Sequence, residues 1–423
     1  MAAWQRRGCR SSTRERSVLD SQPLVRRLHD SPWRGVLAIT GGGSGAISTL
    51  LGRPGASSTV LEAVVPYAEA SLRRWVGGGF DSACSEATAR AMAIAAHERA
   101  RQLEGGGDER YDDLPGGAGG ELFGVGCTAG LASDRPKRGD HRVHVAVQTR
   151  RVTAAYSLTL AKGRRSRAEE EAAAASLVLH AIGATLGLVA DSFEPGEGDR
   201  LEQRSKQASP VWEDMLYGGG QTALVDPSVD RNAFTVQPSY DRVLFPGAFA
   251  PPHAGHRAMA EVAQRRLGRR VTLELSLTNV DKPPIDYLAL DDRLAAVPRV
   301  FGGGAFSGGM EVWLTRLPTF QQKSRNFRGA TFVVGADTAV RIGDPRYYGG
   351  DQPARDAAVD EIAAARCRFL VFGRVAGERF QTLDDLPLPP ALRQLCDGVP
   401  ESEFREDLSS TAIRRGGPAG ASP

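Results

Sequence analysis

Cysteine and histidine are scarce in this sequence. Its 423 residues include seven histidines and five cysteines, and no two cysteines form a C-x-x-C pair. An odd number of widely spaced cysteines argues against a disulfide framework and against a cysteine-based zinc site. The same cysteine usage favours a reducing compartment, so we expect a cytoplasmic protein that holds no metal through its own side chains.

A strong charge of one sign is also lacking. The 53 Lys and Arg residues nearly balance the 50 Asp and Glu residues, which leaves a formal net charge of +3. A charge this small gives no reason to expect nucleic acid as the main partner.

No segment has the composition of a membrane span. Ala172–Ala190 carries no formal charge, but it is rich in alanine and has no tryptophan or tyrosine at either end. Membrane helices carry bulkier apolar residues and interfacial aromatics. We therefore interpret this stretch as a buried helix of a soluble protein that has no membrane partner.

The two ends of the chain have distinct compositions. Residues 1–16 are rich in arginine and serine and contain one acidic residue, Glu15. This composition is typical of a flexible N-terminus, and also of a transit peptide that would direct the protein to a mitochondrion or plastid. No apolar segment follows, which argues against a secretory signal. Residues 417–423 have a composition that predicts disorder.

Two blocks of alternating strand and helix patterns predict two α/β domains, at residues 17–190 and 239–416. In the first block, Arg34–Ile39 predicts a strand that leads through a glycine turn into a helix from Ser44. In the second, Tyr240–Phe245 predicts a strand and His256–Leu267 a helix. Residues 191–238 are polar and show little periodicity, so we expect a linker there.

The second block contains a pattern suited to binding phosphate. A predicted strand ends at Phe245, a turn rich in proline and glycine follows, and His253 and His256 flank Gly255 at the start of the predicted helix. The unpaired N–H groups and partial positive charge of a helix N-terminus attract phosphate. Gly255 lets the backbone approach that phosphate closely, and the two histidines can donate hydrogen bonds to its oxygens.

A second motif lies near the C-terminus, where Ser409, Ser410 and Thr411 precede a predicted helix that carries Arg414. The hydroxyl groups can cap that helix, and with the free N–H groups they can hold further phosphate oxygens. The guanidinium adds a planar, charged clamp. Read alone, this motif is only a helix cap.

The G-x-F-x-P-x-H-x-G-H pattern at Gly247–His256, paired with S-S-T-x-I-R at Ser409–Arg414, resembles the nucleotidyltransferase superfamily. Within it the chain is most similar to nicotinamide and nicotinate mononucleotide adenylyltransferases. Val334–Asp337 is similar to that family's G-x-D segment. Trp313, followed by Pro318–Phe320, is similar to its nucleotide-recognition loop.

This resemblance implies a Rossmann-like domain with a parallel sheet that transfers an adenylyl group from ATP to a pyridine mononucleotide in NAD biosynthesis. It implies catalytic roles for His253, His256 and Arg414, and it implies that Mg²⁺ accompanies ATP. The implied nucleotide-binding residues are Gly247, Phe249, Gly255, Lys282, Trp313, Gly335, Asp337, Ser409, Ser410 and Thr411. By residue type alone, Lys282 also fits a solvated loop lysine and Trp313 a buried core side chain.

Thr40–Ser48, Pro54–Ser58 and Val64–Tyr67 together resemble the C-terminal domain of CinA, a family that includes nicotinamide mononucleotide amidases. The resemblance covers about residues 17–188. It makes Thr40, Ser44 and Tyr67 candidate residues of an amidase-like site. It also implies that the glycine-rich segment Phe123–Ala129 is a ligand loop, together with residues 136–139.

The first block departs from that family where the family has a lysine, because this position falls on Leu72. A hydroxyl nucleophile without a base is not activated. The block therefore fits three interpretations: a degenerate ligand-binding or oligomerising domain, an amidase in which Ser44 uses a different base, or a phosphate-binding regulatory domain. Cys127 fits a small buried thiol better than a nucleophile, because no histidine is tied to it.

Three functions stay open for the whole chain. The first is adenylyl transfer to nicotinamide or nicotinate mononucleotide. The second is nucleotidyl transfer to another phosphate acceptor, as in cytidylyltransferases or pantetheine-phosphate adenylyltransferases. The third is a non-catalytic pyridine-nucleotide sensor. The expected partners are ATP and a pyridine mononucleotide, with a homo-oligomer as a further option.

Overall fold

The computed structural model describes residues 22–105, 121–134, 138–228, 230–234, 242–278, 285–376 and 379–405. The chain divides into two compact units, Met1–Gln207 (unit 1) and Ala208–Pro423 (unit 2). Both units are layered α/β structures, which confirms the expected fold class. Within the described ranges, no helix combines the length and the apolar character that crossing a membrane requires.

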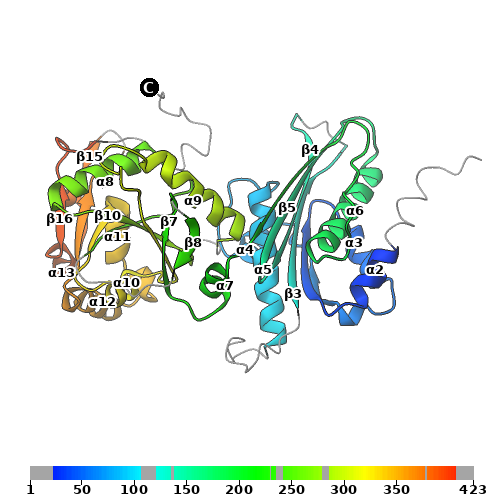
Figure 1. Ribbon diagram of the computed structural model, residues 1–423, viewed down its shortest axis with the longest axis horizontal. Helices are drawn as coiled ribbons and strands as arrows, with labels where there is room; N and C mark the ends of the chain where they lie inside the picture. Colours follow the sequence, from blue (N-terminus) through cyan, green and yellow to red (C-terminus); the bar gives the residue numbers. More distant parts are fainter. Residues whose placement is uncertain are drawn as a thin grey trace, which may run out of the picture. The chain divides into compact units, whose positions relative to one another are not determined.

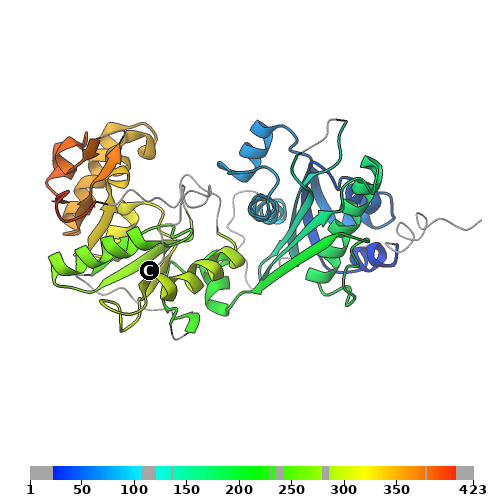
Figure 2. The same cartoon turned by 90° about the horizontal axis from the view of Figure 1, so that it is seen from above.

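Unit 1 is built on a six-stranded sheet in the order β2-β1-β3-β4-β5-β6. β1 pairs in parallel with β2 and β3, and the later strands pair antiparallel with their neighbours. Figures 1 and 2 show α4 and α5 on one face of this sheet, and α2, α3 and α6 on the other. The elements are α2 (Gln22–His29), β1 (Arg34–Thr40), α3 (Gly45–Leu51), η1 (Ala56–Ser58), β2 (Val60–Val64), α4 (Glu69–Val76), α5 (Glu86–Glu104), β3 (Leu122–Gly130), β4 (His141–Thr149), β5 (Val152–Leu160), α6 (Arg167–Thr185) and β6 (Arg200–Gln207).

Capping residues explain where the two long helices of unit 1 begin. The side chain of Ser85 accepts a hydrogen bond from the backbone N–H of Thr88 at the start of α5. Ser166 and Glu169 form a capping box at the start of α6. α6 contains most of the uncharged stretch Ala172–Ala190 and buries its alanine-rich face against the sheet, as the composition predicts.

Two glycines of β3 let α5 lie directly on the sheet. A Cβ at Gly126 would stand 2.1 Å from the carbonyl oxygen of Ala89, and a Cβ at Gly124 would stand 2.1 Å from the amide nitrogen of His97. Both clashes involve helix backbone, so no side-chain rotation relieves them. Phe123–Ala129 is therefore part of a buried strand packed under α5, and the ligand-loop interpretation of this segment is wrong.

The segment expected to be a linker, residues 191–238, contains elements of both units. β6 pairs with β5 and completes the sheet of unit 1, while α7 (Pro210–Tyr217), β7 (Thr222–Asp226) and β8 (Asp230–Phe234) belong to unit 2. The linker prediction was wrong because β6 is an exposed edge strand. Its charged and polar residues lack the apolar alternation that marks a half-buried strand.

Unit 2 is built on a doubly wound sheet of eight strands in the order β16-β13-β12-β9-β10-β11-β7-β8. The strands from β16 to β11 are all parallel, and β7 and β8 extend the sheet in antiparallel fashion. Numbered along the chain, the parallel strands have the Rossmann order. From β9 onward the elements of unit 2 are β9 (Val243–Pro246), α8 (Ala254–Leu267), β10 (Val271–Ser276), α9 (Tyr287–Phe301), β11 (Val312–Thr315), α10 (Phe320–Asn326), β12 (Thr331–Gly335), α11 (Ala336–Gly343), η3 (Pro345–Tyr348), α12 (Gln352–Ala364), β13 (Arg368–Phe372), the separate hairpin of β14 (Arg374–Ala376) and β15 (Arg379–Gln381), η4 (Leu383–Asp385), α13 (Pro390–Arg393) and β16 (Cys396–Val399).

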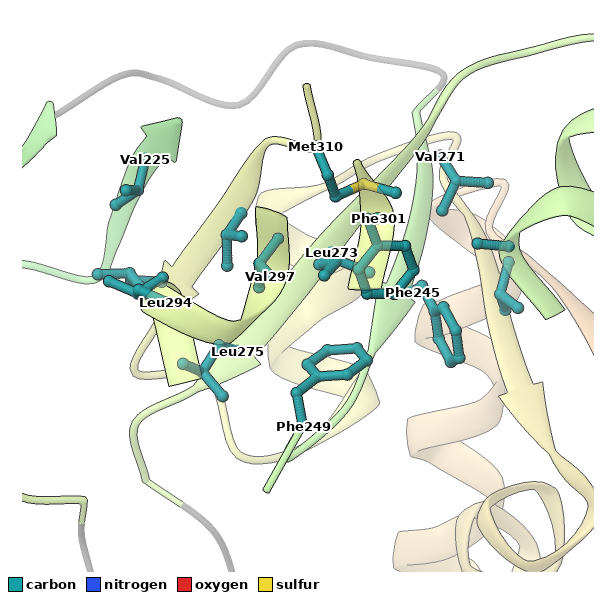
Figure 3. Packing of buried hydrophobic residues seen from close by; sticks show 14 of the residues in the cluster. Val225, Phe245, Phe249, Val271, Leu273, Leu275, Leu294, Val297, Phe301 and Met310 are labelled. Atoms are coloured by element: carbon teal, nitrogen blue, oxygen red, sulfur yellow. The ribbon is translucent and has the colours of Figure 1, made fainter. Parts of the chain in front are cut away.

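Apolar side chains cover both faces of the unit 2 sheet. Figure 3 shows the cluster on one face, where Phe245 of β9 lies near Phe249 and Leu273. On the other face, Leu244 of β9 and Phe332 of β12 belong to a cluster with α11 and α12. Consecutive residues of β9 thus serve opposite faces, as the pleat requires. A parallel sheet covered on both faces presents the C-terminal ends of its strands at one edge, where ligands bind.

Candidate active site

The topological switch point of unit 2 lies between β9 and β12. β9 pairs with β10 from Val243 to Pro246, whereas its pairing with β12 stops at Leu244 opposite Phe332. Doubly wound folds bind ligands in the crevice that such a reversal of strand order creates. The two segments singled out in the sequence, Gly247–His256 and Gly335–Asp337, begin at the C-terminal ends of these two strands.

His253 and His256 meet at the N-terminus of α8. His253 is the residue before the helix, and its backbone N–H donates to Nδ1 of His256 over 3.1 Å. The centroids of the two rings are 3.7 Å apart, and Gly255 between the two histidines is buried. Because Nδ1 of His256 accepts this hydrogen bond, the neutral ring carries its proton on Nε2. Nε2–H is then the group that can donate to a ligand.

Burial keeps His256 uncharged in the ligand-free protein. Its ring packs against Phe245 and Phe249, with centroids 5.9 and 5.1 Å away. This burial, with a smaller contribution from His253, lowers the pKa of His256 to about 3. A bound phosphate would oppose the shift, because a nearby negative charge favours the protonated ring.

Two aromatic residues that the resemblance linked to nucleotide binding lie in the core. Phe249 is 3% exposed, and a Cβ at Gly247 would come within 2.7 Å of its ring. Trp313 of β11 is fully buried and packs against Phe327. Phe249 therefore packs against the ring of His256. Trp313 is a buried core side chain, which is the second of the two interpretations that its residue type allowed.

Gly335 and Asp337 lie at the start of α11, at the end of the strand beside β9. Gly335 precedes the helix, and a Cβ there would meet no atom within 4 Å. Asp337 is exposed and accepts a hydrogen bond from Arg374. The fold thus brings both residues to the edge of the crevice between β9 and β12.

The remaining predicted phosphate contacts fall outside the residues that the structure describes. They are Lys282, Ser409, Ser410, Thr411 and Arg414. Their contacts stay predictions.

A cavity of about 310 Å³ opens beside the loop after β9, and sequence reasoning missed it. Pro246, Gly247 and Ala248 line one side. Its other walls come from β10, from the loop and helix after β11, and from α11 and η3. These residues are Glu274, Ser276, Pro318, Thr319, Phe320, Lys323, Thr338, Arg341, Ile342, Tyr347 and Tyr348. Aromatic and proline side chains with a few polar groups are typical of a pocket for a small planar ligand.

A buried ion pair lines this cavity. Lys323 Nζ donates to Glu274 Oε1 over 2.7 Å, and the side chains are only 4% and 1% exposed. Thr315 also donates to Oε1 of Glu274. The sequence contains a pattern that could have indicated this pair. In the apolar strand that begins at Val271, every second residue from Thr272 is polar, which predicts that one face of the strand carries polar side chains.

In unit 1, a second cavity of about 430 Å³ is lined by the three candidate residues Thr40, Ser44 and Tyr67. Glu171 of α6 reaches into the glycine turn beside it. Its carboxylate accepts hydrogen bonds from Ser44 Oγ at 2.9 Å, from Gly43 N–H at 2.8 Å and from Gly45 N–H at 3.2 Å. The backbone N–H groups of the turn, which could otherwise donate to an anionic ligand, thus donate to the protein's own carboxylate.

The position that the amidases fill with lysine lies in the core of unit 1. Leu72 is 3% exposed and packs with Val76 and Met92. Cys127 is fully buried, its Sγ donates to the carbonyl oxygen of Gly42 over 3.4 Å, and burial raises its pKa. Its prediction as a small buried thiol is confirmed.

Two curated relatives are matched over nearly their whole length. This chain is 30% identical over 190 residues to a Rhizobium etli protein named probable nicotinate-nucleotide adenylyltransferase, an alignment that covers 42% of this chain and 97% of the relative. A protein of the same name from another strain of that species is 29% identical over 196 residues, with the same coverage. The chain belongs to the nicotinate-nucleotide adenylyltransferase family.

Other similarities are shorter or weaker. A relative of the same name from Agrobacterium fabrum is 43% identical over 58 residues, which span 14% of this chain and 31% of the relative. No family model matches the chain. Solved structures similar to it include the competence/damage inducible protein CihA of Agrobacterium tumefaciens, with 21% identity, a TM-score of 0.28, and coverage of 39% of this chain and 94% of that one. The competence damage-inducible protein A of Klebsiella pneumoniae has 18% identity, a TM-score of 0.31, and coverage of 40% and 97%.

In the described part of this adenylyltransferase family member, no three or more His, Cys, Asp or Glu side chains are placed to hold a metal ion. Mg²⁺ usually keeps several waters and binds through substrate phosphates with one or two carboxylates.

Proposed function

We propose that unit 2 transfers an adenylyl group from ATP to a pyridine mononucleotide and releases pyrophosphate. The observation that carries this proposal is the placement of His253 and His256 at the N-terminus of α8, beside the crevice between β9 and β12. A helix end of this kind is suited to phosphate. The family to which the chain belongs supports a nucleotide acceptor.

The transfer depends on positioning and on charge stabilisation. A phosphate oxygen of the mononucleotide attacks the α-phosphorus of ATP and forms a new P–O bond. The bond between the α-phosphorus and the bridging oxygen breaks, and its electron pair leaves on pyrophosphate. The attacking phosphate is already an anion, so no protein base has to remove a proton from it.

His256 fits the role of donor to the reacting phosphate. Its Nδ1 is held by the backbone N–H of His253, which leaves Nε2–H for a phosphate oxygen. Its ring is fixed between aromatic neighbours, so the donor needs little reorganisation as charge develops. The resemblance supports a matching role for Arg414 and the hydroxyl groups before it. Mg²⁺, carried in by ATP, would neutralise charge on the phosphates.

We place the pyridine ring of the acceptor in the 310 Å³ cavity. Gly247 and Ala248 line this cavity and belong to the same loop that ends at His253. A mononucleotide whose ring packs among Phe320 and Tyr348 could therefore extend its phosphate toward the histidines.

The first test is incubation of the purified protein with ATP, Mg²⁺ and either nicotinamide or nicotinate mononucleotide. Products are separated by liquid chromatography and identified by mass spectrometry. We expect a dinucleotide and pyrophosphate. His256→Asn should lower turnover by about 10²–10³-fold, as the loss of one fixed donor does. His180→Asn, on α6 of unit 1, is the matched control and should not change turnover.

The other two functions give different results in the same assay. A nucleotidyl product formed from ATP and phosphopantetheine, or from cytidine triphosphate and an alcohol phosphate, with none from a pyridine mononucleotide, would assign the chain to another acceptor. Binding of ATP and mononucleotide without any product would support the sensor. Failure to bind ATP, cytidine triphosphate and pyridine mononucleotide alike would contradict all three.

For unit 1 we propose a domain that does not hydrolyse nicotinamide mononucleotide. Glu171 already holds the amides of the glycine turn, and Leu72 stands where a lysine base would be required. Incubation with nicotinamide mononucleotide in the absence of ATP should return it unchanged. Appearance of nicotinate mononucleotide would refute the proposal and would favour Ser44 with Glu171 as its base.

A further inference from the structure

One side of helix α11 lines the 310 Å³ cavity. Thr338, Arg341 and Ile342 are among the lining residues, and their spacing of three and four residues places them on the same face of the helix. Ile342 is buried, whereas Arg341 is exposed, so a ligand in the cavity can reach its guanidinium. Arg341 therefore brings a permanent positive charge to an accessible wall of the cavity.

The carboxylates of α11 and of its C-terminal cap pair with other arginines. Asp337, in the first turn, accepts a hydrogen bond from Arg374. Asp344, the capping residue, accepts from Nε and Nη2 of Arg346 at 2.8 and 2.6 Å. The two acidic side chains nearest to Arg341 along the chain are thus held by cations of their own.

The charges that line the cavity favour an anionic ligand. Among the described lining residues, Lys323 and Arg341 are cations and Glu274 is the one anion. Lys323 and Glu274 form their ion pair over 2.7 Å with side chains 4% and 1% exposed, so this pair is neutral and closed to a ligand. The net positive charge that a ligand meets is therefore that of Arg341. A guanidinium has five N–H donors in a planar fork that matches a carboxylate, more than a single partner can use.

The position of Arg341 along α11 matches the ring end of the proposed acceptor. The helix starts at the edge of the crevice, where the proposed function places the phosphates, and Arg341 lies about 6 Å further along the axis than Asp337. Tyr348 also lines the cavity, and its hydroxyl donates to the carbonyl oxygen of Ile342 over 3.0 Å. A pyridine ring that packs against Tyr348 would thus lie beside the turn that carries Arg341.

We propose that Arg341 determines the choice of acceptor by binding a carboxylate on the pyridine ring. This inference rests on the proposed function, because it takes the ring to lie in this cavity. A carboxylate can accept two parallel hydrogen bonds from the guanidinium and compensates its charge, whereas a carboxamide offers one carbonyl oxygen and no charge. Nicotinate mononucleotide should therefore be preferred to nicotinamide mononucleotide, and Arg341 should be the residue that creates the preference.

The substitution Arg341→Met tests this, because it removes the charge and keeps a long side chain. The ratio of kcat/KM for nicotinate mononucleotide to that for nicotinamide mononucleotide should fall by about tenfold or more, the size expected for hydrogen bonds to a charged group. Arg341→Lys keeps the charge without the planar fork, so its ratio should lie between those of the wild type and Arg341→Met. Arg325→Met, which removes an exposed arginine of α10 paired with Glu361, is the matched control and should leave the ratio unchanged.

The wild-type protein supplies a measurement that does not depend on a variant, since a preference for the amide acceptor would overturn the inference. An equal loss for both acceptors in Arg341→Met would also overturn it, because Arg341 would then contact a group that the two acceptors share, such as the phosphate. In both cases a dinucleotide still forms, and the proposed function would stand. Absence of any dinucleotide from the wild-type protein with either acceptor would overturn the proposed function and this inference together.

Discussion

Replacing Gly126 by alanine tests the closest packing contact in unit 1. The new Cβ would stand 2.1 Å from the carbonyl oxygen of Ala89 and 2.6 Å from the amide nitrogen of Ala93, whereas ordinary contact begins at 3.4 Å. Both atoms belong to the backbone of α5. The helix must therefore move away from β3 as a body, and it cannot do so without loosening its other contacts.

The size of the effect follows from what lies at this contact. Ala89, Ala93 and Ala146 form a small, fully buried cluster between α5 and the sheet. Overpacking a well-packed core costs about 1–3 kcal/mol, and a clash with backbone puts Gly126→Ala at the upper end, about 3 kcal/mol. For a unit of this size, that corresponds to a fall in melting temperature of roughly 6–12 °C.

Thermal unfolding followed by circular dichroism measures this. Gly139→Ala is the matched control, because a Cβ there would meet no atom within 4 Å. Gly139 also belongs to the residues that the CinA resemblance linked to a ligand loop. An unchanged melting temperature for Gly126→Ala would refute the packing argument. Loss of mononucleotide binding in both variants without loss of stability would restore the ligand-loop interpretation.

Three further results are expected. Unit 2 should lose stability as the pH falls from 6.5 toward 3, by up to about 1.4 kcal/mol per pH unit. The reason is that His256 has a pKa of about 3 in the folded protein and stays neutral there, whereas in the unfolded chain it takes up a proton. His256→Asn should flatten this dependence in urea titrations at several pH values. Lys323→Met should cost about 3–5 kcal/mol in the same titrations, because it leaves Glu274 charged and unpaired in the core, and Glu274→Gln in the same chain should recover part of the loss. Leu72→Lys should lower the melting temperature of unit 1 without creating amidase activity, since the position is buried among apolar side chains.

The histidine site was predictable because its geometry is local. His253 and His256 are three residues apart at a strand-to-helix junction, and a helix N-terminus forms wherever such a junction folds. The resemblance implied only a Rossmann-like parallel sheet, and the observed strand order is what brings Gly335 and Asp337 to the end of the strand beside β9. The cavity was not predictable in this way. Lys323 and Glu274 are 49 residues apart, and they meet because β10 pairs with β11 and α10 follows β11 in the chain.

Glycine was the hardest residue to interpret from sequence. Gly43 and Gly126 both lie in glycine-rich segments that resemble ligand loops. Gly43 has a φ of 90° and belongs to a turn, whereas Gly126 is in an extended strand and is required by a helix that precedes it in the chain. A turn with positive φ and a strand under a closely packed helix both require glycine, so the sequence shows the same residue type in each case. Only the position of α5 in the structure shows which requirement applies to Gly126.

The polar strand β6 has a consequence for self-association. An edge strand offers unpaired N–H and C=O groups to which another molecule can add a strand. Along β6, Arg200, Glu202, Arg204 and Lys206 occupy alternate positions and so share one face of the sheet. A second copy pairing along this edge would bring the mostly positive side chains of the two strands close together on one face. Growth of the sheet from one molecule to the next is therefore disfavoured at this edge.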